Sequence, residues 1–289
     1  MLIALLKTMR PRQWSKNVFI FAALVFDKQL LHADAFLQTL AGFALFCLIS
    51  SAVYIFNDLA DVEADREHPE KKHRPIASGK LPVSAAWISG IVLVVITLGL
   101  GYFLTAGFEA VLIVYFLLMI VYSKWLKHIP IVDVFVLAAG FVLRVHAGVT
   151  LIHVERFSPW LYVVMSLLSL FLGFGKRRAE LSLLAHGAGS HRKVLEGYTL
   201  PLLDQYIMIV SATTIIAYSL YTFNAPNVPQ NDSMMLTIPF VVYALFRYLY
   251  LVHVKQAGGS PEDILLSDRP FQVAMVLWAL SVLAVFYLS

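Results

Sequence analysis

Charged residues are scarce in this chain of 289 residues. Only 14% of the residues are Asp, Glu, Lys or Arg, whereas about 25% is usual in a soluble domain. Hydrophobic residues make up 60% of the chain, and the mean hydropathy is +0.77. One soluble core cannot hold this apolar surplus, but nine membrane spans of about 20 residues would use about 180 residues, which matches it. The composition excludes a soluble enzyme and a disordered protein, and it indicates a polytopic all-α membrane protein.

Cysteine and the common metal and nucleotide motifs are also lacking. The single cysteine, Cys47, lies in an apolar run, so a disulfide framework is excluded. The nine histidines show no His-Glu-x-x-His spacing, and the chain contains no Gly-x-x-x-x-Gly-Lys-Ser/Thr loop. The sequence therefore lends no support to a zinc hydrolase or a P-loop enzyme. The pI near 9.1 is compatible with nucleic-acid binding, but in a membrane protein basic residues more often mark cytoplasmic loops.

Apolar runs between polar breaks predict nine membrane-spanning helices. They are expected at residues 17–26, 36–56, 85–104, 108–122, 131–152, 160–175, 206–223, 234–254 and 270–288. The first run is weak, because Asp27 and Lys28 interrupt it and Lys16 would have to extend toward the membrane surface. No convincing cleavage site follows this run, so we expect a membrane helix there rather than a signal peptide.

The basic residues predict the orientation of these spans. With a cytoplasmic N-terminus, 18 of the 22 Lys and Arg residues fall in inner segments, two (Lys28 and Arg156) in outer segments, and two (Arg144 and Arg247) inside spans. Basic residues concentrate on the cytoplasmic side of membrane proteins. We therefore expect the N-terminus inside and the C-terminus outside.

Two inner connections are long and charged, at residues 57–84 and 176–205. Long loops on a bundle of short hairpins are where function usually concentrates. The loops occupy matching places in two successive groups of helices, which hints at an internal duplication, although no repeat is visible in the sequence. We expect a single domain over residues 1–289, with both loops on its cytoplasmic side.

The first loop opens with acidic residues at helical spacing. If the preceding helix continues, Asn57, Asp58, Asp61 and Asp65 project from one face. Like charges at this spacing repel one another, and oxygen ligands grouped on one side suit Mg²⁺ bound together with substrate phosphates. A solvated helix end that is merely acidic is the alternative. We expect Mg²⁺ as the cofactor, with these four residues as ligands and the three aspartates as catalytic residues.

Basic residues follow these acids directly. Lys71 and Arg74, the latter fixed beside Pro75, are expected to hold the part of a diphosphate that the metal does not neutralise. Lys72 and Lys80 are better explained as ordinary inner-loop charge.

These motifs carry a family resemblance. The pattern Asn-Asp-x-x-Asp-x-x-x-Asp at 57–65, at the inner end of the second of nine expected helices, resembles the UbiA superfamily of intramembrane prenyltransferases, as does the tract Arg-Pro-Ile-Ala-Ser-Gly at 74–79. The resemblance extends over most of the chain. It implies an all-α bundle around a central cavity that is open toward the lipid and capped by the two inner loops.

The second loop departs from the common pattern of that superfamily. Most members carry a second Asp-rich motif there, whereas this chain has Lys176, Arg177, Arg178 and Glu180. Three successive cations suit an additional phosphate better than a second metal cage, although inner-loop topology alone is the alternative reading. Together with the stretches 10–17 and 122–133, this departure resembles the decaprenyl-phosphate phosphoribosyltransferase branch.

That branch implies transfer of 5-phosphoribose from phosphoribosyl diphosphate to a polyprenyl phosphate, an early step toward arabinose donors for cell walls. An anionic phosphate oxygen would attack C1 from the face opposite the leaving diphosphate, so positioning matters more than a strong base. Asp65 could instead contact a ribose hydroxyl. The residues expected to bind substrate are Lys16, Asn57, Lys71, Arg74, Tyr122, Lys124, Lys127, Asp133, Arg144, Lys176, Arg177, Arg178 and Glu180.

One of these residues, Arg144, lies well inside a span, where an ionisable group is costly and functional by default. It is expected either to bind the lipid phosphate or to form a structural salt bridge. Arg247 is expected to be structural.

Two other functions stay open. A prenyltransferase joining a polyprenyl diphosphate to an aromatic acid such as 4-hydroxybenzoate would ordinarily need the second Asp motif. A secondary transporter would place its ion site near the membrane midplane, whereas these acids lie at the inner boundary. Expected partners are therefore the lipid phosphate, phosphoribosyl diphosphate and the membrane, without nucleic acid. The sequence leaves homo-oligomerisation open.

Overall fold

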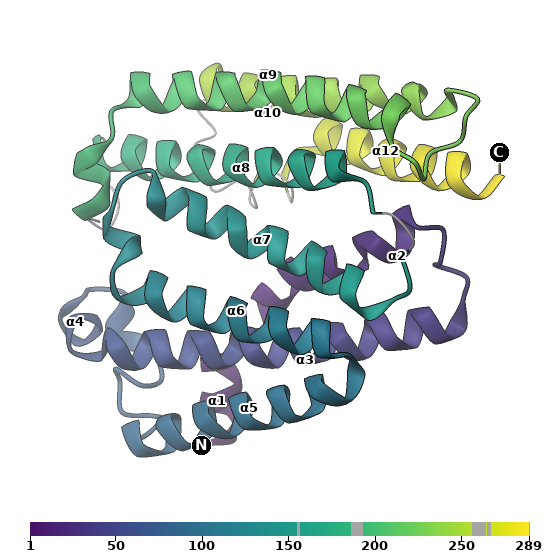
Figure 1. The fold of residues 1–289 in the computed structure, drawn as a ribbon. Helices are drawn as coiled ribbons and strands as arrows, with labels where there is room; N and C mark the ends of the chain where they lie inside the picture. The colour runs from purple at the N-terminus through teal and green to yellow at the C-terminus, as the bar shows by residue number, and fades with distance from the viewer. Residues whose placement is uncertain (155–156, 186–192, 256–263, 265–266, 289) are drawn as a thin grey trace. The chain divides into compact units, whose positions relative to one another are not determined.

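The computed structural model of the protein describes residues 1–154, 157–185, 193–255, 264 and 267–288. These residues fold into α-helices and short 3-10 helices, as the composition predicts (Figure 1). The chain divides into two compact units. The first comprises Met1–Val25, Gln29–Leu126 and Leu143–Val154, and the second comprises Phe26–Lys28, Lys127–Val142 and Glu155–Ser289.

The first unit is built around one long helix, α3, which α1, α5 and α6 contact. Its helices are α1 (Leu2–Met9), the 3-10 helix η1 (Pro11–Phe21), α3 (Ala33–Ala60), α4 (Val62–Glu67), η2 (Lys71–His73), α5 (Val83–Leu104) and α6 (Ala106–Lys124). The five-residue helix α2 (Ala22–Phe26) follows η1, and its last residue is assigned to the second unit.

The second unit contains the helical hairpin of α8 and α9 (Figure 1). Its helices are α8 (Pro159–Ala185), η4 (Lys193–Gly197), α9 (Leu200–Asn224), η5 (Ser233–Thr237), α10 (Ile238–His253) and α12 (Arg269–Leu288). Helix α7 (Val132–Leu151), which follows η3 (Leu126–His128), gives its first half to this unit and its second half to the first unit.

Short polar and proline signals set the ends of these helices. The Thr105 hydroxyl accepts a hydrogen bond from the Phe108 N–H at 3.0 Å and so caps α6 one residue after α5 ends. Thr199 caps α9 in the same way, with Pro201 in the first turn, where proline costs no helical hydrogen bond. Helices α5 and α6 therefore form a tight helical hairpin.

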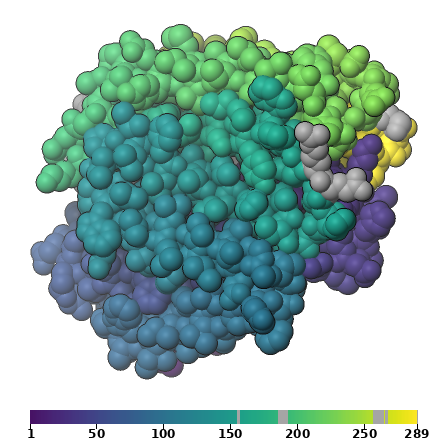
Figure 2. All heavy atoms as spheres, viewed as in Figure 1, coloured from purple at the N-terminus to yellow at the C-terminus, as the bar shows by residue number. Residues whose placement is uncertain are grey.

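Eight helices in the described part of the chain are long and apolar enough to cross a membrane. They correspond to the second through ninth expected spans, and the protein is a multi-pass membrane protein. The weak first span, expected at residues 17–26, falls on η1 and α2 (residues 11–26) rather than on one long α-helix. Apolar side chains such as Ile91, Val95 and Ile113 are exposed on α5 and α6, whose atoms form part of the surface visible in Figure 2, as expected for helices that face lipid.

Two expectations about the long loops are wrong in detail. Helix α8 continues through Ala185, so residues 176–180 lie on a helix and not in a loop. Helix α3 ends at Ala60 rather than continuing through Asp65. The expected central cavity and its capping by the two loops stay predictions.

Candidate functional site: an acidic pair held by two arginines

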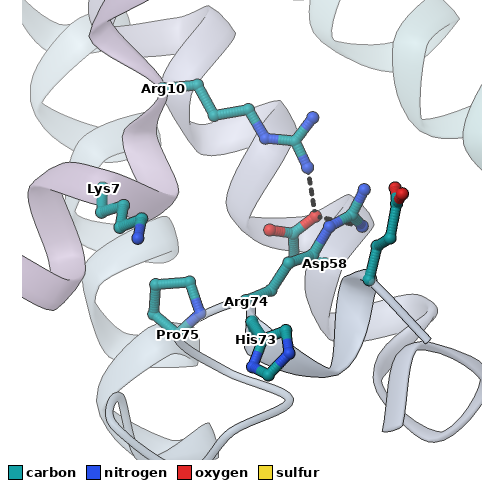
Figure 3. A pocket seen from close by; sticks show the side chains of 7 residues that line it. Lys7, Arg10, Asp58, His73, Arg74 and Pro75 are labelled. Carbon is teal, nitrogen blue, oxygen red and sulfur yellow. Dashed lines mark hydrogen bonds and ion pairs between the residues drawn. The ribbon is translucent and has the colours of Figure 1, made fainter. Parts of the chain in front are cut away.

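A pocket of about 270 Å³ in the first unit lies beside the inner end of α3. The N-terminal segment, α3 and the loop that follows α4 contribute its walls, and Figure 3 shows their side chains. The residues that line it are Lys7, Arg10, Asp58, Glu70, His73, Arg74 and Pro75. The pocket thus combines one buried carboxylate with several cationic side chains.

A break in the helix at Asp61 changes how the acidic residues are arranged. Asp61 adopts φ −97° and ψ 8°, and α4 begins at the next residue. Asp58 and Asp65 are seven residues apart, which is about 10.5 Å along a straight α-helix. The break allows both carboxylates to reach one cation, and both side chains are buried. The four residues therefore do not share one face of a continuous helix, as the sequence led us to expect.

That shared cation is the guanidinium group of Arg74. Its Nη1 atom donates to Asp58 Oδ1 at 3.1 Å and to Asp65 Oδ2 at 2.7 Å. Arg10 Nη2 donates to the same Asp58 oxygen at 2.6 Å. Figure 3 shows both guanidinium groups directed at the Asp58 carboxylate. Two arginines thus compensate the two buried negative charges. Such compensation is needed because a charge buried away from water is costly unless it is paired.

Arg10 was not among the residues expected to form the site. Its backbone is left-handed (φ 54°) where α1 ends and η1 begins, and its guanidinium carbon lies 4.8 Å from the centre of the Tyr54 ring. The sequence did hold a signal, because Arg10 and Arg74 are each followed by proline. Each side chain therefore leaves a backbone that proline restricts.

The backbone around Arg74 is well anchored. Its N–H donates to the Lys71 carbonyl at 2.9 Å, and its own carbonyl accepts from the Ser78 N–H at 2.9 Å. Ile76 and Leu81 are buried in a hydrophobic cluster with residues of α1, α3 and α5. The loop therefore presents Arg74 from a fixed point. Lys71, by contrast, lies in η2 next to the pocket and is not among its lining residues.

The structure joins Asn57 to the expected segment at 122–124. The Ser123 hydroxyl of α6 donates to the Asn57 side-chain oxygen. Tyr122 is half-buried beside it, and Lys124 is exposed, with its Nζ atom 5.4 Å from the centre of the Trp125 ring. Asn57 therefore has a protein partner on α6.

A second polar cluster lies deeper in the first unit. Arg144 is buried and donates from Nε to Asn17 Oδ1 at 2.8 Å and from Nη2 to the Tyr115 hydroxyl at 2.9 Å. The Asn17 amide in turn contacts Cys47 Sγ and Ser50 Oγ on α3. Lys16, half-buried, precedes Asn17 on η1. Arg144 thus ties η1 to α6 and α7, and these contacts favour a structural role for it.

The second unit holds Asp133 and Arg177 as a buried ion pair. Arg177 Nε donates to Asp133 Oδ2 at 2.6 Å, and its Nη1 donates to Glu180 Oε2 at 2.7 Å. The Tyr198 hydroxyl donates to the other Asp133 oxygen at 2.7 Å and accepts the Ile131 N–H. Burial raises the pKa of Tyr198, and the hydrogen bond to the Asp133 carboxylate raises it further. Tyr198 was not expected from the sequence.

The remaining cations of this cluster differ in their contacts. Arg178 pairs with Asp204 on α9 and lies near His253, so Asp204 is a further residue that the sequence analysis missed. Lys176 and Lys127 are half-buried. Because Arg177 and Arg178 are held by carboxylates of the protein, direct phosphate binding by either residue stays a prediction.

With this geometry established, comparison with known proteins decides the family. The sequence profile of the UbiA prenyltransferase family matches residues 17–258. The chain belongs to this family.

Relatives that match nearly the whole chain are named decaprenyl-phosphate phosphoribosyltransferase. The protein from Corynebacterium glutamicum is 34% identical, covering 98% of this chain and 87% of the relative. The protein from Mycolicibacterium smegmatis is 35% identical (99% and 93%), and that from Mycobacterium tuberculosis is 36% identical (96% and 92%).

Solved structures support the same fold. A UbiA homologue from Archaeoglobus fulgidus, bound to DMAPP and Mg²⁺, matches with a TM-score of 0.74 at 19% identity, covering 99% of both chains. A digeranylgeranylglyceryl phosphate synthase structure matches with a TM-score of 0.68 at 16% identity, over 100% of this chain and 99% of the other. At these identities the match concerns the fold alone.

The acidic pair of this UbiA protein suits a divalent metal ion, because hard cations prefer oxygen ligands. In the described residues no three His, Cys, Asp or Glu side chains lie close enough together to enclose a metal. Mg²⁺, however, is usually bound by one or two carboxylates together with substrate phosphates and waters. Asp58 and Asp65 already converge on one cation, the Arg74 guanidinium. The donor set therefore fits Mg²⁺ once a diphosphate completes it.

Proposed function

We propose that this UbiA-family protein transfers 5-phosphoribose from 5-phosphoribosyl 1-diphosphate to a polyprenyl phosphate such as decaprenyl phosphate, with release of diphosphate. The observation that supports this most directly is the convergence of Arg10 and Arg74 on Asp58 and Asp65. That arrangement supplies both metal ligands and phosphate-binding cations. The nearly full-length similarity to phosphoribosyltransferases of this kind gives the substrate class.

Asp58 and Asp65 would hold Mg²⁺, and Asn57 and Asp61 stay predicted ligands of the same ion. The ion would neutralise charge on the leaving diphosphate as the C1–O bond breaks. Arg74 and Lys71 would bind the diphosphate oxygens that the ion does not contact, and Arg10 would hold Asp58 in place. Charge stabilisation and orientation carry the reaction, because the attacking phosphate oxygen is already anionic.

The phosphate of the lipid acceptor and the 5-phosphate of the donor need further cations. For the lipid phosphate and the 5-phosphate we propose Lys16, Tyr122 and Lys124 from the first unit, and Lys127 and Lys176 from the second. Arg177, Asp133 and Glu180 would act by positioning, since their charged groups already bind one another. Arg144 would position η1, which carries Lys16. A ribosylated lipid of this kind would feed the synthesis of arabinose donors for cell walls.

We also infer that residues 11–26 form a ninth membrane crossing. Contacts of η1 advance steadily along α3: Trp14 Nε1 donates to Ser51 Oγ at 3.0 Å, the Asn17 amide contacts Cys47 and Ser50, and the Phe21 ring lies 5.7 Å from that of Phe43. The series begins one residue before η1, where Arg10 donates a hydrogen bond to Asp58 near the inner end of α3. The segment thus runs antiparallel to α3 from its inner end.

The 3-10 geometry gives this short segment the necessary length. Eleven residues of 3-10 helix rise about 22 Å, and the five residues of α2 add about 7.5 Å. The sum of about 30 Å equals the thickness of the hydrocarbon core. We place the protein in a bacterial inner membrane with its positive residues inside. The N-terminus, the Asp58 pocket and both long connections would then lie on the cytoplasmic side.

A lipid-extraction assay tests the activity. Purified protein receives Mg²⁺, a polyprenyl phosphate and phosphoribosyl diphosphate labelled in the ribose, and the label in the organic phase is counted. We expect label only with both substrates, its loss in EDTA, and a loss of at least about 100-fold for Asp58→Asn, because the electrostatic stabilisation of the leaving group is removed. Asp34→Asn, at the opposite end of the same helix, is the matched control and should retain activity.

The opposite outcome is equally clear. Absence of label, together with product formed from a polyprenyl diphosphate and 4-hydroxybenzoate, would overturn the phosphoribosyl transfer and leave an aromatic prenyltransferase. Full activity of the Asp58→Asn variant would exclude Asp58 as a ligand of a catalytic metal ion.

A further inference from the structure

Arg74 occupies the place of a cation between the two buried acids. A single nitrogen, Nη1, lies within hydrogen-bond distance of both Asp58 and Asp65. Bringing two buried carboxylates together is unfavourable unless a positive charge lies between them. We propose that Arg74 is a stand-in for the metal: it holds the acidic pair together in the metal-free enzyme, and its guanidinium moves to the diphosphate when the metal binds. This inference rests on the metal-dependent reaction proposed above.

The Arg74 side chain has the freedom that such a movement needs. It is 28% exposed, whereas the carboxylates it joins are 3% and 4% exposed. It lines the pocket of about 270 Å³ with Lys7, His73 and Pro75 (Figure 3), so its guanidinium has space into which it can turn. The backbone beneath it is anchored by Ile76 and Leu81. The movement is therefore a rotation of one side chain and requires no opening of the loop.

Arg10 is less suited to this role. It contacts Asp58 at 2.6 Å and packs over the Tyr54 ring, and within the described part of the chain Asp58 is the only carboxylate that it contacts. We therefore assign it to holding Asp58 in both states. Arg74 is the group that joins the two acids.

The exchange has a direct electrostatic consequence. An arginine stays protonated at every physiological pH, so its ion pairs with Asp58 and Asp65 cannot break by loss of a proton. The side chain must move instead. Metal alone must displace it from two hydrogen bonds, whereas metal with diphosphate offers the guanidinium a new anionic partner. The metal-free enzyme should thus bind Mg²⁺ weakly alone and strongly together with phosphoribosyl diphosphate. Arg74 couples the two ligands.

Binding of Mn²⁺ without substrate tests this exchange. Metal-stripped protein in detergent is titrated with Mn²⁺, and free Mn²⁺ is followed by electron paramagnetic resonance. We expect Arg74→Gln to bind Mn²⁺ about tenfold more tightly than wild type, because the cation that competes with the metal for the two carboxylates is gone. Its thermal midpoint in EDTA should fall and should recover with Mn²⁺. Phosphoribosyl diphosphate should then enhance Mn²⁺ binding less than it does in wild type.

Arg66→Gln is the matched control, because Arg66 lies on the neighbouring helix α4 and pairs with an exposed acid, Glu63, at 2.8 Å. It should match wild type in both measurements. If Arg74→Gln does not fold in EDTA, Arg74→Lys keeps a cation with a single point of contact and should show an intermediate Mn²⁺ affinity. Wild-type affinity in both Arg74 variants would overturn the stand-in role.

The result can be separated from the activity itself. Wild-type protein that binds Mn²⁺ but transfers no phosphoribose would overturn the proposed reaction, and the Arg74 comparison would still decide the exchange. Wild-type protein that binds no Mn²⁺, with or without diphosphate, would overturn both.

Discussion

Asn17 binds the buried guanidinium group of Arg144, which lies within a membrane-spanning helix. Its side-chain oxygen accepts a hydrogen bond from Arg144, and its amide contacts two residues of α3. Hydrogen bonds to charged groups contribute about 1.5–3 kcal/mol. We expect Asn17→Ala to lower the free energy of unfolding by about that amount, because Arg144 loses a buried partner. Denaturant titration in detergent measures the change.

A matched alanine substitution isolates this effect. Asn224, at the last position of α9, is exposed, and Asn224→Ala should change the free energy of unfolding by less than about 0.5 kcal/mol. Equal losses for the two variants would argue against a special role for the Asn17–Arg144 pair.

Single residues also show where prediction from the sequence stops. The position of Arg144 in an apolar run predicts that it needs a partner, but the partner lies 127 residues away in the chain. The acidic motif at 57–65 is visible in the sequence, whereas the joining of Asp58 and Asp65 by Arg74 depends on the break at Asp61. The sequence does not show that break, because no glycine or proline lies between Asn57 and Asp65. The hydrogen bonds from the Asp61 N–H to the Asn57 carbonyl and from the Asp65 N–H to the Asp61 carbonyl also continue across it.

At the scale of elements, the Asp133 carboxylate joins three segments of the second unit. It accepts from Arg177 on α8 and from Tyr198 just before α9, while it lies itself near the start of α7. Breaking a buried ion pair by removing one partner costs about 3–5 kcal/mol. We expect Asp133→Leu to destabilise the fold by about that amount, and Tyr198→Phe by about 1 kcal/mol. Thermal unfolding in detergent measures both.

The control and the double variant make this prediction decisive. Asp232→Asn changes an exposed aspartate in a turn and should have little effect. Asp133→Leu combined with Arg177→Met should recover much of the loss, since no unpaired charge then stays buried. A double variant as unstable as the sum of its parts would exclude the pair as the source of the stability.

The apolar runs predicted these elements well because a membrane span needs a fixed length of apolar helix. The eight long helices match the expected spans, with ends that differ by a few residues in most cases. The largest difference is at α8, which extends ten residues beyond the expected end of its span. Lys176, Arg177 and Arg178 look like a loop in the sequence because of their charge, but Asp133 and Asp204 pair with the two arginines and allow the helix to continue.

At the scale of the whole molecule, the membrane topology depends on residues 11–26. If they cross, residue 3 and residue 31 lie on opposite sides of the membrane; if they do not, both lie on one side. Ile3 and Leu31 are each more than 80% exposed, so cysteines there should be reachable by a reagent in solution. The natural cysteine, Cys47, is buried and can be replaced by serine to give a background without thiols.

Labelling with a membrane-impermeant maleimide in intact spheroplasts decides between the two arrangements. We expect Leu31→Cys to be labelled and Ile3→Cys to be protected, because the stepwise contacts of η1 along α3 carry the chain from the level of Asp58 to the start of α3. Lys72→Cys, in the connection that holds the acidic site, should be protected with Ile3→Cys, and permeabilisation should expose all three. Labelling of both Ile3→Cys and Leu31→Cys would leave eight crossings, and Arg10 would then have to reach Asp58 across the membrane from the outer side. The Arg10–Asp58 contact that builds the site is therefore the observation that favours the ninth crossing.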